Sequence, residues 1–356
     1  MPPPPAPPQP GPPPGWTPNQ AVPPYGPRSP YGYAPNWRPP KRKSSAAAVI
    51  GGLTGVLAFV FVAIVVASAV LKSAQRHDPV SPIALPTSTF DPTSKPSTSK
   101  PKSRPTGKDS TSDKPAVTLN RGLKNNTVYR AGSLAQPNCP AGNASIYNHA
   151  QFKTLILKTG KCMGQAWAPA LKRVGIEWRP PGYMIAQRRG RGACGDYPSP
   201  GSNVPYYCPS NSTIYASTSA MAEEYGPLSS WNGVIISMMG HEYGHHVQHL
   251  TGISESWWRR YQESSSRSGQ LALTRRHELQ ATCFGAMFMR AVSRSYPVTV
   301  ARRDTLLWAY GHLGDPPGGP RDHGSTRSNA RWFRQGYTRP KAYQCNTWVM
   351  GSSYVS

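Results

Sequence analysis

The pentapeptide His241-Glu242-Tyr243-Gly244-His245 combines two imidazoles and a carboxylate at a spacing that suits metal chemistry. On a helix, His241 and His245 lie one turn apart on the same face, so both imidazoles can reach one metal ion. Glu242 follows the first histidine directly and lies close enough to take a proton from a metal-bound water. We therefore expect His241 and His245 to bind zinc and Glu242 to act as the general base.

A catalytic zinc needs a third protein ligand and an open position for water. Glu278, 33 residues after His245, lies beside apolar positions of a second helical segment, where a carboxylate needs a partner. We expect Glu278 to be this ligand, although an exposed carboxylate in the first helical turn would look the same in sequence. The other candidate ligands are histidines that point elsewhere as their helices turn: His246, His249 and His277.

Three segments must position these residues. The apolar stretch 231–252 predicts a buried helix that carries the motif and ends at Gly252. Residues 271–293 predict a second helix, with an apolar face at positions 279, 283, 284, 287 and 288. Residues 212–216 predict an edge strand on which an extended substrate can pair.

Peptide-bond hydrolysis also needs a donor for the oxyanion of the tetrahedral intermediate. His323, within Asp322-His323-Gly324-Ser325, is the first candidate for this role, and Tyr243 and Tyr215 are weaker ones. The competing interpretation of His323 is a loop histidine that caps a helix.

The composition excludes a uniform globular chain, because 18 of the 41 Pro fall in the first 40 residues and Pro lacks the amide N–H. The chain holds 40 Lys and Arg against 15 Asp and Glu, a net charge of +25. This excludes an enzyme with an acidic shell and allows an anionic partner, such as lipid or an envelope polymer.

The chain divides into four parts by composition. Residues 1–45 are predicted to be a disordered, Pro-rich cytoplasmic tail. Residues 46–71 contain no charge and exceed the roughly 20 residues that cross a bilayer, so they predict one transmembrane helix. Residues 72–118 predict a Ser/Thr/Pro/Lys-rich linker, and residues 119–356 an exported globular domain.

The basic residues 41–43 precede the apolar run and place the N-terminus inside the cell and the domain outside the cytoplasm. Ala67-Ser68-Ala69 leaves a cleaved signal peptide as the alternative to a retained anchor. Both interpretations export the domain.

All six cysteines lie in the exported domain, and their even number predicts three disulfides. Cys194 and Cys208 enclose a Gly/Pro-rich loop and are the best local pair. No C-x-x-C is present, which disfavours a zinc site made of thiolates.

The segment GHEYGHHVQHLTG, followed by HELQATCFGAMF, resembles the putative neutral zinc metallopeptidase family, whose pattern is HE-x-GHHVQ and then ELQADC-x-AG. Upstream, ACGDYPSPGSNVPYYCPSNSTIYAS resembles the CG…YCP…IY segment of that family. Downstream, DHGSTRSNARWFRQGYTRPKAYQCNTW resembles its HGS…R..WF..G…C.TF ending. The resemblance covers residues 129–348, nearly the whole predicted domain.

The resemblance implies a mainly helical α+β, zincin-like metallopeptidase domain with one Zn²⁺ per chain. It implies His241, His245 and Glu278 as ligands and Glu242 as the base, the gluzincin arrangement. It also implies the disulfide pairs Cys194–Cys208, Cys283–Cys345 and Cys139–Cys162. Thr282 departs from the family, which has an Asp there to orient a zinc-bound histidine.

We therefore expect a membrane-anchored zinc peptidase that cleaves peptide or protein substrates outside the cytoplasm. Thr282 motivates one alternative, a degenerate domain that binds peptide or an anionic envelope polymer without cleavage. A second alternative is an interaction protein that functions through its Pro-rich tail. Nucleic acid is not an expected partner, given the predicted anchor and disulfides.

Overall fold

The computed structural model describes residues 118–228, 230–315 and 318–356. The predicted tail, transmembrane helix at 46–71 and linker lie outside the described residues. Within the described part, no helix has both the length and the apolar character that crossing a membrane requires.

The two predicted helices are both present and carry the motif residues. Helix α4, Gly233–Leu250, is followed by Thr251 and by Gly252, whose φ of 75° only glycine adopts readily. Helix α6, Arg267–Ala291, starts four residues before the expected position, because the Ser266 side chain caps it by accepting a hydrogen bond from Gly269 N.

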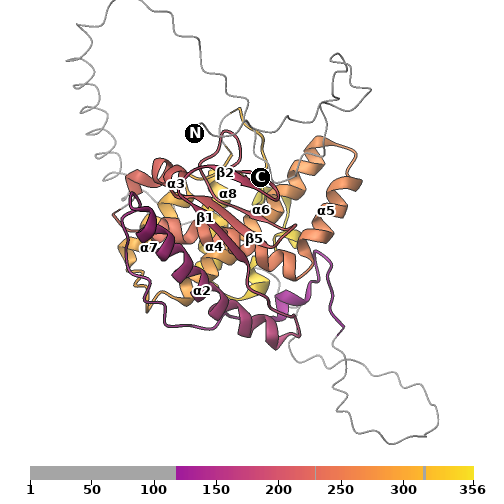
Figure 1. Cartoon of the computed structure of the whole chain (residues 1–356). Helices are drawn as coiled ribbons and strands as arrows, with labels where there is room; N and C mark the ends of the chain where they lie inside the picture. The colour runs from indigo at the N-terminus through magenta and orange to yellow at the C-terminus, as the bar shows by residue number, and fades with distance from the viewer. Residues whose placement is uncertain (1–117, 229, 316–317) are drawn as a thin grey trace, which may run out of the picture.

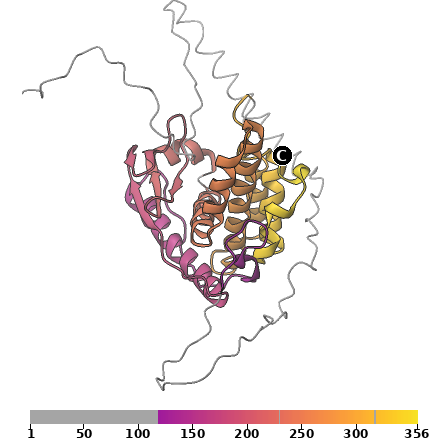
Figure 2. The ribbon, with the colours of Figure 1, turned by 90° about the vertical axis from the view of Figure 1, so that its right-hand side faces the viewer.

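Helix α6 is the centre of the helical layer and lies between α4 and α8, Thr326–Thr338 (Figure 2). Glycines let the backbones of α4 and α6 approach closely. A Cβ on Gly244 would lie 2.7 Å from Ala281 O, and a Cβ on Gly285 would lie 2.8 Å from His241 N. The motif helix is thereby pressed against the helix that carries Glu278.

The strands lie on the opposite side of the domain from α8 (Figure 2). In the three-stranded sheet, β5 (Thr213–Ser217) lies between a parallel neighbour, β1 (Gly182–Ala186), and an antiparallel one, β4 (Tyr206–Cys208) (Figure 1). A separate hairpin pairs β2, Gly190–Gly192, with β3, Gly195–Tyr197.

The prediction that residues 212–216 form an edge strand is therefore wrong. The strand exists, but it has a neighbour on each side, and Ile214, Tyr215 and Ala216 are buried. Strand β4 is an edge of the sheet and packs beside α4. A short strand pattern does not reveal how many neighbours it has, because pairing depends on distant residues.

The remaining elements surround this framework. They are helices α2 (His149–Arg173), α3 (Thr218–Tyr225), α5 (Ile253–Glu263) and α7 (Val300–Tyr310), and the short 3₁₀ turns η2 (Thr127–Arg130), η3 (Gly226–Leu228), η4 (Ala342–Cys345), η5 (Thr347–Val349) and η6 (Ser352–Tyr354). The described chain is mainly helical with few strands, which confirms the expected α+β class.

Three disulfides, all with the expected partners, cross-link the domain. Cys139–Cys162 ties the N-terminal segment to α2, and Cys283–Cys345 ties α6 to η4. Cys194–Cys208 closes the loop that leads into β4. The sequence separations of 23, 62 and 14 residues make each bond a constraint on the unfolded chain.

Replacing Gly285 by Ala should lower the free energy of unfolding. The added Cβ would lie 2.8 Å from His241 N and 2.9 Å from Gly240 C, so α4 and α6 must separate. Overpacking of this kind exceeds the ~1 kcal/mol gained in helix propensity, and we expect a net loss of about 2 kcal/mol. Urea unfolding of the full-length protein, followed by circular dichroism, measures it.

Gly351→Ala is the matched control, because its added Cβ meets no atom within 4 Å. Equal stability of the two variants would show that α4 and α6 do not need the glycine contact.

Candidate metal centre and active-site cavity

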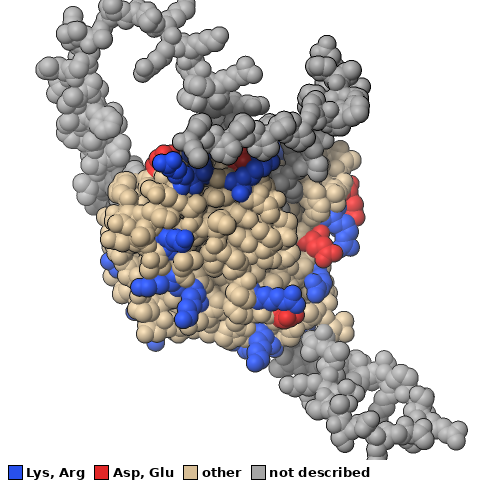
Figure 3. All heavy atoms as spheres, viewed as in Figure 1, with Lys and Arg blue, Asp and Glu red and all other residues tan. Residues whose placement is uncertain are grey.

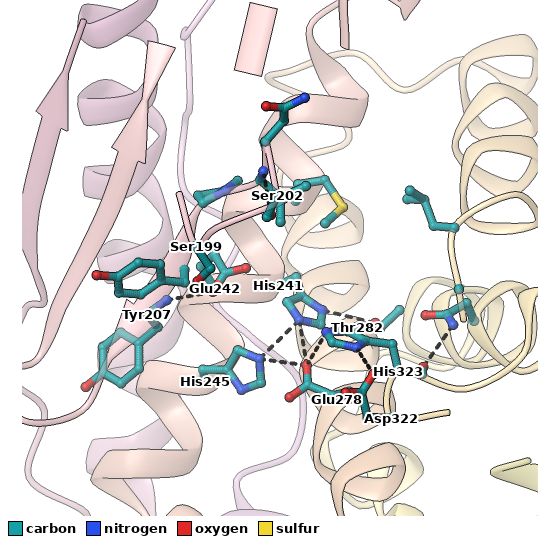
Figure 4. A pocket seen from close by; sticks show the side chains of 18 of the residues that line it. Ser199, Ser202, Tyr207, His241, Glu242, His245, Glu278, Thr282, Asp322 and His323 are labelled. Carbon is teal, nitrogen blue, oxygen red and sulfur yellow. Dashed lines mark hydrogen bonds and ion pairs between the residues drawn. The ribbon is translucent and has the colours of Figure 1, made fainter. Parts of the chain in front are cut away.

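Three predicted ligand atoms converge on one buried point (Figure 4). His241 Nε2 lies 3.1 Å from His245 Nε2, and Glu278 Oε2 lies 3.2 and 3.0 Å from these two nitrogens. The three residues are only 6–7% exposed. Glu278 is thus a buried side chain in the interior of α6 and not an exposed first-turn carboxylate.

The hydrogen bond made by Nδ1 of His245 leaves the other ring nitrogen, Nε2, to bind a metal ion. His245 Nδ1 lies 2.9 Å from Gln248 Oε1. Gln248 Nε2 donates to His277 O at 2.8 Å and to Gln280 Oε1 at 3.0 Å, which fixes the orientation of the amide. Because an amide oxygen only accepts, Nδ1 of His245 carries a proton and Nε2 faces Glu278 and His241.

Thr282 orients the other imidazole. Its hydroxyl oxygen lies 3.0 Å from His241 Nδ1, and the side chain is buried. The hydroxyl can accept the Nδ1 proton, which again leaves Nε2 to face the convergence point. The contact is the one expected of the Asp found here in the family, but it is made by a neutral group.

The donor set fits a zinc ion. One proton can join at most two of the three converging atoms well, whereas a cation contacts all three. Ligand atoms of a tetrahedral zinc with bonds of ~2.0–2.1 Å lie about 3.3 Å apart, close to the distances found here. Two imidazole nitrogens and a carboxylate are also ligands that zinc prefers.

Burial and charge set the protonation of this group. Burial lowers the pKa of His241 to about 4. Burial also lowers the pKa of His245, but Glu278 and Glu242 outweigh it and the net shift is upward. For Glu278, burial favours the neutral acid, yet His245, His323 and His241 hold its pKa well below the ordinary value. A proton and a metal ion therefore compete for His245.

Glu242 lies beside the convergence point and is held by the sheet (Figure 4). Its Oε2 accepts a hydrogen bond of 2.8 Å from Tyr207 N in strand β4. Burial raises the pKa of Glu242 to about 7. A carboxylate with a pKa near neutrality suits proton transfer in both directions.

His323 reaches the same centre from the loop before α8. Its Nε2 lies 3.7 Å from Glu278 Oε2, and its Nδ1 lies 2.7 Å from Asp322 Oδ1. Asp315 Oδ1 accepts from the backbone N of Asp322 and of His323, which fixes the turn. Burial lowers the pKa of His323, but Glu278 and Asp322 outweigh it and raise it to about 9.

The alternative role of His323 as a helix cap is wrong. Ser325 is the N-cap of α8, since its side chain accepts a hydrogen bond from Ser328 N. The His323 side chain is 40% exposed and lines the cavity, so a substrate can reach it.

These groups open into a cavity of about 380 Å³. The segment before β4 forms one wall, and α4, α6 and residues within 310–314 and 322–323 form the others. The metal-binding group, the candidate base and the candidate oxyanion donor all line this one solvent-accessible cavity. They are His241, His245, Glu278, Glu242 and His323.

The two weaker oxyanion candidates do not line this cavity. The Tyr243 hydroxyl is buried against α2 and accepts a hydrogen bond of 3.0 Å from Trp178 Nε1. The Tyr215 hydroxyl accepts hydrogen bonds from Asn211 Nδ2 and Ala193 N. Both side chains are buried in the core.

The alternative histidine ligands lie outside the converging group. His246 contacts the Tyr207 hydroxyl and Arg179 O through its two nitrogens. His249 packs with Tyr207 at a ring distance of 6.1 Å. His277 stacks between the rings of His245 and Trp257, so it supports a ligand without being one.

Sequence reasoning did not assign several residues that hold the site together. They are Tyr207, Gln248, Gln280, Asp315 and Asp322. A signal for Gln248 exists, because an amide three residues after a motif histidine shares its helix face and needs a buried partner. No local pattern reveals that Tyr207 N meets a carboxylate 35 residues away.

Thr282→Val should weaken zinc binding by roughly 10- to 100-fold, because His241 Nδ1 loses its only side-chain partner among the described residues. The apparent zinc affinity of the full-length protein, measured by competition with a chromophoric chelator, tests this. Thr282→Ser keeps the hydroxyl and should bind zinc like the wild type. An unchanged affinity in the Val variant would mean that the hydroxyl does not orient His241.

The comparisons agree with this geometry. The family model described as "Putative neutral zinc metallopeptidase" matches residues 116–306, a span that includes all three converging residues and Glu242 but ends before His323.

Among known proteins, YpfJ of Escherichia coli is 27% identical over 214 residues, which cover 56% of this chain and 71% of that relative. Mb2605 of Mycobacterium bovis and Rv2575 of Mycobacterium tuberculosis are each 26% identical over 217 residues, covering 54% of this chain and 69% of each relative. No solved structure matches the chain significantly. The family match spans more than half of the chain and contains the metal-binding group, so the chain belongs to the putative neutral zinc metallopeptidase family.

Proposed function

We propose that the protein is a zinc-dependent peptidase with His241, His245 and Glu278 as metal ligands. The observation that carries the proposal is the convergence of these three side chains at one buried point, with Glu242 beside them in an open cavity. Zinc, when bound, polarises the scissile carbonyl and lowers the pKa of a bound water.

Glu242 is the general base in this proposal. Tyr207 N holds its Oε2, so Oε1 is left to take the proton of the attacking water and pass it to the leaving amine. The rigid backbone donor prevents the carboxylate from turning toward solvent. In this proposal, strand β4 orients the general base. The role predicted for residues 212–216 was instead to pair with an extended substrate.

His323 is the proposed donor to the oxyanion. The pKa of about 9 keeps its imidazole protonated at neutral pH, and Asp322 occupies Nδ1. Nε2–H is therefore directed toward the metal-binding group and can stabilise negative charge that develops on the substrate oxygen.

We extend the proposal to the chain as a whole. Residues 1–45 are a cytoplasmic tail, 46–71 a membrane anchor, 72–118 a linker and 119–356 the catalytic domain outside the cytoplasm. The uncharged apolar run supports the anchor, and three disulfides support an oxidising compartment for the domain. The substrates are then peptides or proteins of that compartment.

One observation favours a second candidate function, a domain that binds peptide or an anionic envelope polymer without cleaving it. Thr282 supplies a neutral hydroxyl where the family has an acid, so zinc binding is weaker than with a charged partner. In this case the cavity is retained as a binding site.

Zinc content and cleavage separate these functions. Wild-type protein should contain about one zinc per chain by elemental analysis, and Glu278→Ala should lose it. Glu242→Gln should keep the zinc but lose roughly 10²- to 10⁴-fold in peptide cleavage, because the base is gone. Cleavage of a mixed peptide library by the full-length protein is followed by mass spectrometry.

Folded wild-type protein without zinc would overturn the enzyme proposal. Zinc-loaded wild-type protein that binds peptides without cleaving them would favour the second candidate.

His323→Gln should lower kcat roughly 10²- to 10³-fold with little change in KM or zinc content, because it removes a charged donor that acts on the transition state. His312→Gln, an exposed histidine whose Nδ1 contacts Trp308 O, is the control and should behave like the wild type. A rise in KM with kcat unchanged would instead assign His323 to substrate binding.

A further inference from the structure

The cavity lining differs in composition from the surface of the domain around it, because within the described part of the chain it contains acidic side chains but no Lys or Arg. Residues 119–356 contain 27 Lys and Arg and 11 Asp and Glu, and Figure 3 shows basic side chains spread over one face. Among the described residues that line the cavity, however, four are acidic and none is Lys or Arg. They are Glu224, Glu242, Glu278 and Asp322.

Three of these carboxylates are used by the proposed chemistry. Glu278 faces the imidazoles of His241 and His245, and Asp322 is paired with His323. Glu242 accepts the hydrogen bond from Tyr207 N. Glu224, at the end of α3, is the fourth.

Glu224 has only a weak polar contact in the described part of the chain, 3.5 Å from Asn203 Nδ2 to its Oε2. Arg189 lies nearby, where it donates to Ser202 O and to Asn203 Oδ1 and pairs at 3.7 Å with the adjacent Glu223, but in the described part of the chain it forms no ion pair with Glu224. Glu224 is therefore a solvent-accessible carboxylate in the cavity without a cationic partner among the described residues.

Glu224 lines the same cavity as His241, Glu242 and His323, so a substrate bound in that cavity can reach it. In Figure 4, Ser202 lies on the side of His241 away from Glu278. Its neighbour Asn203, which contacts Glu224, lines the same cavity.

The walls suit a long cationic side chain. Met238 and Tyr310 line the cavity, and the Tyr310 hydroxyl donates to Met238 Sδ at 3.5 Å. The aliphatic stem of Lys or Arg can pack along such apolar groups while its charged head reaches a carboxylate. An acidic side chain at this position would meet an unpaired like charge.

We propose that Glu224 forms a subsite for a cationic side chain, so that the cavity selects peptides with Lys or Arg near the scissile bond. This inference rests on the proposed peptidase function and names its substrate class. The positive charge of the domain surface does not oppose it, because fields from exposed charges are screened over about 8–10 Å at physiological salt. At contact distance the local carboxylate decides the preference.

Cleavage of matched peptides by the full-length protein tests the subsite. A position-scanning library, in which each position carries Lys, norleucine or Glu in turn, should show Lys favoured about two- to fivefold in kcat/KM at one position. Glu224→Gln should abolish that preference and Glu224→Lys should shift it to Glu. Glu255→Gln, which removes an exposed acid on α5 outside the cavity lining, should preserve the wild-type preference.

Peptide binding to zinc-loaded Glu242→Gln protein, measured by fluorescence anisotropy, repeats the comparison without catalysis. The Lys peptide should bind about two- to fivefold more tightly than its norleucine counterpart, and adding Glu224→Gln should remove the difference. Equal binding of the two peptides, or a Lys preference that survives Glu224→Gln, overturns the subsite. Charge-selective binding without cleavage by the wild type would instead retain the subsite and overturn the peptidase proposal.

Discussion

The close contact of α4 with α6 is the constraint on which the site depends. Gly244 packs against the carbonyl oxygen of Ala281, and Gly285 packs against the backbone nitrogen of His241. A side chain at either position would separate the helices, and the three ligand atoms now 3.0–3.2 Å apart would no longer share one ion. The disulfide Cys283–Cys345 fastens α6 from its other side.

Around this contact, neutral amides orient the ligands. Gln280 donates to the Tyr129 hydroxyl and Cys345 O and accepts from Gln248, which in turn faces His245. Each amide side chain fixes the orientation of the next one. Residues that do not bind the metal ion therefore determine which nitrogen of His245 is protonated. Thr282, which contacts His241, is likewise a neutral hydrogen-bonding group. The negative charge at the centre is thus confined to Glu278 and Glu242, where the chemistry needs it.

Electrostatics divide the molecule into an outer and an inner part. The surface carries many Lys and Arg side chains, whereas the cavity is lined by carboxylates and histidines. Because salt screens the outer charges more strongly than those in a partly enclosed cavity, the two parts can attract partners of opposite sign.

The sequence alone was sufficient to predict the features that depend on the local spacing of residues along the chain. His241 and His245 share a helix face because they are four residues apart, and apolar spacing identified both helices, so Glu278 could be placed beside them. Thr282 was identified through the family pattern. Tertiary structure alone decided that β5 is central, that Tyr207 N holds Glu242, and that Glu224 shares the cavity. Those contacts join residues that are distant in the chain, and local sequence patterns carry no information about which distant segments pack together.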